Sequence, residues 1–228
     1  MNKEEKIKDF YNKRIKKLGD EKFLAEITEE NISGGMILSF LKENIKDKKK
    51  KILDAGCGEG RFSRYFIENG YDITGMDFSE EYVRVAKKNL KKGKFVVGSV
   101  TRIPFKDNSF DYIFSVDVFQ HIPDLEKALA ETYRVLKKEG SLIIIDKNKY
   151  GLNKKYLIPQ KLIKNIRDLR TWKYSGYKEK WFSPKKLRKI LNKLFRNVKY
   201  KYLIEKNKKK IFYSLPQLNL FVAWIAKK

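Results

Sequence analysis

The sequence predicts an α/β fold: a mostly parallel, seven-stranded sheet that ends in an antiparallel hairpin. From residue 51 onward, apolar strand-like runs alternate with amphipathic helix-like segments, which is typical of βαβ units and a parallel sheet. The last two strand-like runs have only a loop between them, and strands joined without a helix pair antiparallel. The seven expected strands are residues 50–56, 72–77, 94–99, 110–118, 140–146, 197–205 and 219–227.

Helix signals fall between these runs. Ser79 and Asp124 are residue types that favour the N-cap position, and Ser183 followed by Pro184 is typical of a helix start. The segment before the first strand is expected to form two or three helices with a break at Gly34-Gly35. The expected later helices are residues 60–69, 79–90, 124–138 and 183–195.

A length of 228 residues fits a single domain with a sizeable core. We divide that domain, residues 1–228, into four parts. Their expected roles are a helical lid, a ligand-binding core, a basic and aromatic insert on the substrate side, and a final helix with the hairpin. The parts are residues 1–48, 49–146, 147–182 and 183–228.

The net charge of +25 is concentrated at one end of the chain. Residues 147–228 hold 25 Lys and Arg against three acidic residues, whereas residues 1–146 are nearly balanced. A functional basic face for an anionic partner is one interpretation. The alternative is a solvated surface in a lysine-rich protein.

Composition also bears on the compartment. Cys57 is the single cysteine, so no internal disulfide forms, and a reducing cytoplasm is expected. The first residues are charged where a signal peptide needs an apolar run. The longest apolar stretch, 221–226, is too short to span a bilayer, although peripheral membrane contact stays open.

The first strand ends in a glycine-rich turn, LDAGCGEGRFS, with Gly56, Gly58 and Gly60. Glycines let a backbone approach a ligand closely and present N–H donors to it. A nicotinamide dinucleotide site needs a further glycine where Arg61 stands. Asp54, two residues before the first glycine, opposes a pyrophosphate but suits an ammonium group. A nicotinamide oxidoreductase is therefore disfavoured.

Asp77 ends the second strand, 21 positions after the first glycine. A carboxylate in that place accepts hydrogen bonds from both hydroxyls of a ribose. Phe78 follows, where its ring is expected against an adenine. The alternative for Asp77 is a residue that only caps the following helix.

Three stretches taken together resemble a known family: LDAGCGEG with Asp77, then VVGSVTRIPFKDNSFDYIFSVDVFQHI, then ALAETYRVLKKEGSLIIID. They resemble the type 11, ubiquinone/menaquinone-biosynthesis-like class I methyltransferases. The resemblance covers roughly residues 50–146 and implies a Rossmann-like fold with S-adenosylmethionine as cofactor. It says little about the acceptor, because this family methylates very different molecules.

The resemblance also implies roles for residues along the cofactor. Asp54, Gly56 and Gly58, in the loop that also holds Cys57, would bind the methionine end, and Asp77 would bind the ribose. The family usually has Gly-Asp-Ala after the third strand, where the Asp accepts from the adenine amino group. This chain has Gly-Ser-Val there, so the shorter, uncharged Ser99 and the backbone of Val100 are the expected adenine contacts. Ser115 and Val116 would lie near the reacting methyl.

Methyl transfer from a sulfonium needs alignment and exclusion of water more than acid–base chemistry. His121, the single histidine, follows the fourth strand in FQHIPD and is the candidate general base if the acceptor must lose a proton. The alternative is a loop residue that bonds the backbone or the cofactor. No metal site is expected.

The acceptor is less defined. Ser-Val-Asp-Val stands where enzymes that methylate exocyclic base amines carry Asn/Asp-Pro-Pro-Tyr, so that chemistry is disfavoured. Cys57 is committed to the cofactor loop, which argues against thiolate-dependent cytosine methylation. Aromatic residues interleaved with Lys and Arg precede Ser183. They favour an anionic small-molecule or lipid-like acceptor. The alternatives for these residues are an RNA methyltransferase that stacks bases and contacts phosphates, and a packed edge with solvated lysines. A non-catalytic cofactor-binding protein is a further alternative for the chain. The aromatic residues are Tyr150, Tyr156, Trp172, Tyr174, Tyr177, Trp181 and Phe182.

Overall fold

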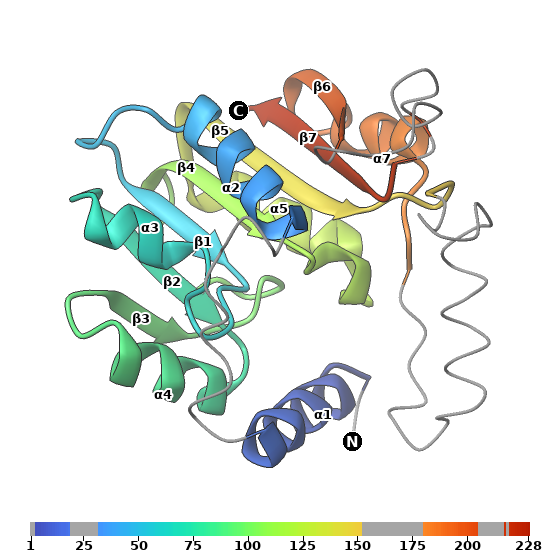
Figure 1. Cartoon of the computed structure of the whole chain (residues 1–228). Coiled ribbons are helices and arrows are strands. Elements are labelled where there is room, and N and C mark those ends of the chain that lie inside the picture. Colours follow the sequence, from blue (N-terminus) through green and yellow to red (C-terminus); the bar gives the residue numbers. More distant parts are fainter. Residues whose placement is uncertain (1–2, 19–31, 152–179, 205–216, 218) are drawn as a thin grey trace.

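A computed structural model describes residues 3–18, 32–151, 180–204, 217 and 219–228 (Figure 1). In these residues a seven-stranded sheet has the order β3-β2-β1-β4-β5-β7-β6. The strands are β1 (Ile52–Ala55), β2 (Ile73–Asp77), β3 (Lys94–Val97), β4 (Phe110–Val116), β5 (Leu136–Lys147), β6 (Arg196–Leu203) and β7 (Phe221–Lys227). The helices are α1 (Lys3–Leu18), α2 (Ile32–Asn44), α3 (Ser63–Glu68), α4 (Glu80–Asn89), the 3-10 turn η2 (Phe119–His121), α5 (Leu125–Val135) and α7 (Pro184–Leu191).

The sheet topology confirms the predicted fold class. Strands β1 to β5 pair in parallel, whereas β7 pairs antiparallel with both β5 and β6. The chain order reverses at β1, which lies between β2 and β4. In open α/β sheets, ligands bind beyond the carboxyl ends of the strands at such a reversal. The fold therefore places a ligand site where the loops after β1, β2 and β4 meet.

Helices cover both faces of the sheet (Figure 1). On one face, the buried side chains of α2 and α3, such as Leu41 and Phe66, pack on Ile52 and Phe114. On the other face, α5 and α7 pack through residues such as Leu129 and Leu187. None of the helices in the described ranges combines the length and apolar character that a bilayer-spanning segment requires.

Local signals located three helix starts correctly, and two of these starts use a side-chain cap. The predicted N-caps Ser79 and Asp124 accept backbone N–H bonds from Tyr82 and Lys127. At Ser183 the helix does begin, with Pro184 in its first turn, but the serine hydroxyl makes no cap bond. Backbone bonds supply that start instead: the Ser183 carbonyl accepts from Leu187 N–H at 3.0 Å.

The predicted break at Gly34-Gly35 is wrong, because α2 runs through both glycines. They lie in the first turn, and Ile37 and Leu41 further along are buried against the sheet. Tertiary packing of an apolar face thus outweighs the low helix propensity of glycine. The predicted helix 124–138 is also too long. It ends at Val135, because β5 starts at Leu136.

Candidate functional site

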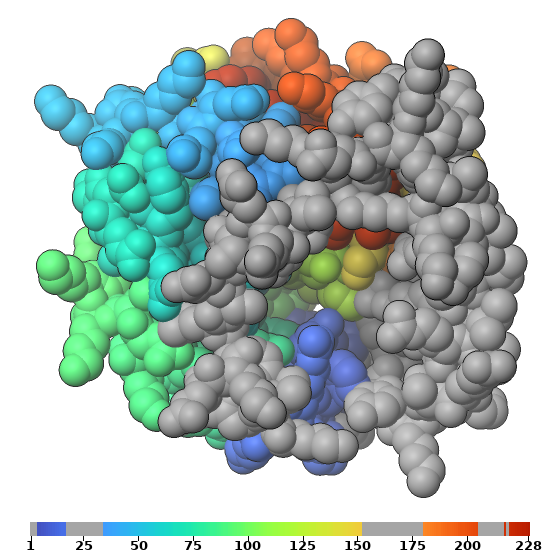
Figure 2. Space-filling view, viewed as in Figure 1, coloured from blue at the N-terminus to red at the C-terminus, as the bar shows by residue number. Residues whose placement is uncertain are grey.

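A cavity of about 490 Å³ opens at the carboxyl edge of β1, β2 and β4, within the size range of small-molecule sites. In the space-filling view the surface is hollowed beside α1, and yellow-green and yellow segments are visible inside the hollow (Figure 2). The lining combines sequence-predicted residues with residues from α1 and α2. It includes Glu4, Ile7, Tyr11, Ile37, Gly56, Cys57, Gly58, Asp77, Phe78, Ser99, Val100, Val116, His121, Lys147 and Phe221.

The glycine-rich turn after β1 forms one wall of the cavity. Gly56 has a φ of +90°, and a Cβ added there would lie 2.3 Å from Val118 Cγ2. The N–H groups of Gly56 and Cys57 donate to the Met76 carbonyl at 2.7 and 3.0 Å, which ties the turn to β2. Both the left-handed backbone and the lack of space therefore require glycine at position 56.

Asp77 ends β2 at the centre of the cavity edge. Its carboxylate accepts from Gly58 N–H at 3.0 Å and from Ser79 N–H at 2.9 Å. The side chain is buried, and this burial raises the pKa of Asp77 to about 6 despite the backbone donors. A buried carboxylate that lines a cavity favours ligand groups that donate hydrogen bonds to it, such as ribose hydroxyls.

Two of the predicted cofactor residues are not among the residues that line the cavity. The Asp54 carboxylate is buried behind the turn and accepts from Ser63 Oγ at 2.7 Å. Burial, with a smaller contribution from the nearby Asp77 charge, raises the pKa of Asp54 to about 7. Ser115 is also buried and donates to the Ala55 carbonyl at 2.7 Å. These buried contacts stabilise the glycine-rich turn after β1 on the side away from the cavity.

Helix α1 covers the cavity and is attached to α4. Lys8 Nζ lies 2.8 Å from Glu80, and Ser79 Oγ lies 2.5 Å from Asn12 Oδ1. Ile15 is buried in a cluster with Val85 of α4. These contacts turn one side of α1 toward the cavity.

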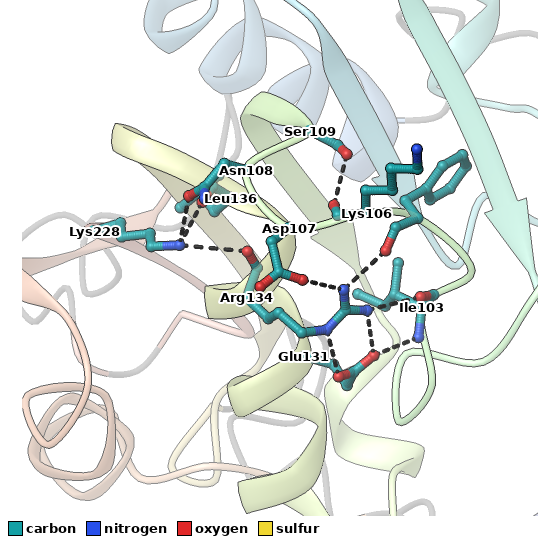
Figure 3. Close-up of polar contacts among 10 residues, drawn as sticks. Ile103, Lys106, Asp107, Asn108, Ser109, Glu131, Arg134, Leu136 and Lys228 are labelled. Carbon is teal, nitrogen blue, oxygen red and sulfur yellow. Dashed lines mark hydrogen bonds and ion pairs between the residues drawn. The ribbon is translucent and has the colours of Figure 1, made fainter.

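The loop between β3 and β4 is held by Arg134 of α5 (Figure 3). The guanidinium binds Glu131 and Asp107 at 2.8 Å and donates to the carbonyls of Ile103 and Phe105 at 2.9 Å. Glu131 also accepts from the Ile103 N–H at 2.8 Å. Arg134 thus fixes the loop whose first residues line the cavity.

His121 lies at the end of η2 and lines the cavity, as the sequence predicts. Its Nε2 is 3.2 Å from the Tyr11 hydroxyl and 3.2 Å from Gln120 Nε2. Gln120 in turn donates to Asp117 at 2.6 Å. The histidine therefore belongs to a polar network that joins α1 to the loop after β4.

Comparisons with known proteins identify the family of the chain. A family model described as "Methyltransferase domain" matches residues 53–144. An uncharacterized protein of Methanocaldococcus jannaschii is 31% identical over 185 residues, which cover 75% of each chain. The chain belongs to the class I S-adenosylmethionine-dependent methyltransferases of the type 11 family. The predicted family, fold and cofactor, S-adenosylmethionine, are confirmed.

Two further methyltransferases show how far the likeness extends. Demethylmenaquinone methyltransferase of Thermotoga maritima is 37% identical over 99 residues, 42% of this chain and 43% of that protein. The chain thus matches less than half the length of that relative. Phosphoethanolamine N-methyltransferase 2 of Haemonchus contortus, solved with S-adenosyl-L-methionine, superposes with a TM-score of 0.65 at 19% identity. The superposition covers 85% of this chain and 52% of the Haemonchus contortus chain, and this likeness concerns the fold alone.

Sequence reasoning missed most of the methyltransferase cavity wall that comes from α1, including Glu4 and Tyr11. The periodicity of a helix shows which of its faces is apolar, but it does not show which distant segment that face packs against. Of the aromatic residues predicted to cover the acceptor, Tyr156, Trp172, Tyr174 and Tyr177 lie outside the described residues. Trp181 and Phe182 are buried, and Lys147 Nζ lies 5.8 Å from the centre of the Trp181 ring.

Proposed function

We propose that this chain transfers a methyl group from S-adenosylmethionine to an anionic, partly apolar small molecule or lipid-like acceptor. The observation that carries the proposal is one continuous cavity, which joins the glycine turn and Asp77 to a second half with His121, Lys147 and Phe221. One part fits a nucleoside with a charged tail. The other part offers a cation and apolar walls to a second molecule.

The residues present fit S-adenosylmethionine. Asp77 would accept hydrogen bonds from the ribose hydroxyls, and Phe78 and Val100 line the cavity on the side of β3. The glycine turn would approach the methionine end, with Asp54 buried behind the turn. When bound, the cofactor supplies an electrophilic methyl on a sulfonium, which is a good leaving group.

The chain's own residues then act mainly by positioning. Helix α1 and the loop after β4 enclose the cavity from two sides, which excludes water and limits the directions from which an acceptor approaches. Val116 and His121 line the part of the cavity beyond the glycine turn. In this proposal they lie beside the methyl and the incoming nucleophile.

The acceptor class follows from the second half of the cavity. Lys147 lies at the end of β5, with its Nζ 3.2 Å from Asp117, and Ile37 and Phe221 add apolar surface. A cation beside apolar walls favours an acceptor with an acidic or ionised group on an apolar body. The name of the Thermotoga maritima relative, which specifies demethylmenaquinone, supports a lipid-like acceptor.

A methyl-label experiment tests the proposal. Purified protein is incubated with methyl-labelled S-adenosylmethionine and, separately, with small acidic metabolites, a lipid extract and RNA. Label in either of the first two fractions supports the proposal, and label only in RNA supports an RNA methyltransferase. Binding of S-adenosylhomocysteine without transfer to any fraction would indicate a non-catalytic protein.

Two lysine variants sharpen the acceptor assignment. Lys147→Ala is expected to raise the acceptor KM about tenfold, the scale of one lost hydrogen bond to a charged group, with cofactor affinity unchanged. Lys149→Ala is the matched control, because Lys149 is exposed and is not among the cavity-lining residues. Equal KM values for both variants would remove Lys147 from acceptor binding.

A further inference from the structure

We propose that Glu4 of α1 binds the adenine of the cofactor by accepting a hydrogen bond from its 6-amino group. This inference rests on the proposed function, and it makes the N-terminal helix part of the cofactor site. It also names the carboxylate that the loop after β3 lacks.

The sheet order places the base. The glycine turn follows β1, Asp77 ends β2, and Gly98 to Val100 follow β3, which is the next strand in the order β3-β2-β1. A nucleoside whose ribose is held at Asp77, with its tail on the glycine turn, directs its base toward the loop after β3. Phe78, Ser99 and Val100 line the cavity there.

Glu4 brings a carboxylate to that same position. It lines the cavity, and Ser99 Oγ donates to its Oε1. Thr101 Oγ1 lies 3.2 Å from each of the two carboxylate oxygens, and the Ser99 and Thr101 hydroxyls are 2.8 Å apart. Two hydroxyls from the loop after β3 therefore fix the carboxylate of a residue that is 95 positions away in sequence.

The hydrogen-bonding capacity of these groups decides what Glu4 recognises. A carboxylate accepts about four hydrogen bonds, so the two hydroxyls leave room for a further donor. The 6-amino group is the donor that the adenine ring presents, whereas its ring nitrogens accept. Ser99 Oγ donates to Glu4 and accepts from the Thr101 N–H, so the charged carboxylate is the stronger acceptor at this position.

Other contacts hold α1 in place without Glu4. Lys8 pairs with Glu80, Asn12 contacts Ser79, and Ile15 packs among buried residues of α4. A neutral residue at position 4 should therefore change the chemistry of the site and leave the helix docked. This separation makes a conservative substitution informative.

The test compares two ligands that differ at the 6-position, S-adenosylhomocysteine and its deaminated analogue S-inosylhomocysteine, by calorimetry. A carboxylate accepts from the amino group of the first and repels the carbonyl of the second. The wild type should prefer the adenine compound about 10- to 100-fold, the range for one hydrogen bond to a charged group. In Glu4→Gln the preference should fall to within about threefold, because the amide donates to the carbonyl.

Asp9→Asn is the matched control. It removes one carboxylate from the same helix, and Asp9 pairs with the exposed Lys13 and lines neither the cavity nor the adjoining pocket beside Ser99. Its preference for adenine should equal that of the wild type. Because the readout is a ratio of two affinities in one protein, a reduced folded fraction changes both affinities alike.

A charge relocation gives a second, independent readout. Since Ser99 Oγ contacts Glu4, a carboxylate at position 99 lies at the same place, and Glu4→Gln/Ser99→Asp should recover the adenine preference. An unchanged preference in Glu4→Gln, with S-adenosylhomocysteine still bound, would overturn the role of Glu4 alone. Failure of the wild type to bind S-adenosylhomocysteine would instead overturn the proposed function.

Discussion

The two halves of the cavity, which we assign to the cofactor and to the acceptor, are built in different ways. The cofactor half comes from turns that directly follow β1, β2 and β3, and most of its residues lie within Gly56 to Val100. The acceptor half brings together α1, the loop after β4, the end of β5 and the start of β7. Local sequence encodes the first half, and long-range packing creates the second.

This difference matches the chemistry of each half. A cofactor shared across a family needs the same groups at the same places, so a turn and one carboxylate recur in a recognisable order. Acceptors vary, and segments from distant parts of the chain provide walls that change independently. Glu4 crosses this division, because a residue of the N-terminal helix reaches the cofactor half.

The largest expected effect is at the glycine turn. Gly56→Ala should weaken S-adenosylhomocysteine binding by more than about 100-fold and lower the free energy of unfolding by roughly 1–3 kcal/mol. The new Cβ would meet Val118 in a left-handed backbone. Calorimetry and thermal unfolding measure both quantities.

Gly70→Ala is the control for backbone strain. Gly70 has a φ of +76°, but no atom lies within 4 Å of an added Cβ. It should lose about 1–2 kcal/mol of stability and bind the cofactor normally. If Gly56→Ala also bound normally, the glycine turn would not be the wall that approaches the cofactor.

A smaller effect is expected at Asp77. Asp77→Ala should weaken cofactor binding by roughly 2–3 kcal/mol, the scale of a charge-assisted pair of hydrogen bonds. The variant also frees the N–H groups of Gly58 and Ser79, so its thermal unfolding is measured in parallel. Wild-type affinity in Asp77→Ala would place the ribose elsewhere.

What the sequence predicts well follows the same division. The positions of the strands, the cap at Ser79 and the glycine-rich turn after β1 follow from short local patterns. The helix through Gly34-Gly35 and the contact between Glu4 and Ser99 depend on packing between distant segments, which no local pattern encodes. Ser99 did carry a signal: it is a polar but uncharged residue at a position where the family resemblance implies a carboxylate.

The pH dependence of binding is expected to be about tenfold. Burial raises the pKa of Asp77 to about 6, so at pH 5 most of the protein carries a neutral Asp77 that accepts ribose hydrogen bonds poorly. Affinity for S-adenosylhomocysteine should be about tenfold lower at pH 5 than at pH 7, because one unit below its pKa only about a tenth of the Asp77 carboxyl is ionised. Asp77→Asn should flatten this profile, and a slope that persists in that variant would assign it to another group.

Burial of a second carboxylate, Asp54, makes the free protein less stable as the pH rises, whereas cofactor binding is expected to strengthen. The folded-state pKa of Asp54, about 7, lies above its usual value of 3.8, so its contribution to stability is lost as pH rises toward 7. Asp54→Asn should therefore unfold at a higher temperature than the wild type at pH 8, and the difference should vanish near pH 4. An asparagine oxygen still accepts from Ser63, which keeps the comparison clean.

The smallest expected effect tests the acceptor half at His121. We expect His121→Ala to keep turnover within about threefold of the wild type, because a sulfonium leaving group needs no proton transfer when the acceptor is already ionised. Its Nε2 also faces Tyr11 and Gln120, which suits a residue that shapes the loop after β4. Tyr11→Phe should then behave like His121→Ala, with small changes in acceptor KM and an intact pH profile. A loss of roughly 10²–10⁴ in turnover, with cofactor affinity unchanged and one limb of the pH profile removed, would instead make His121 the general base.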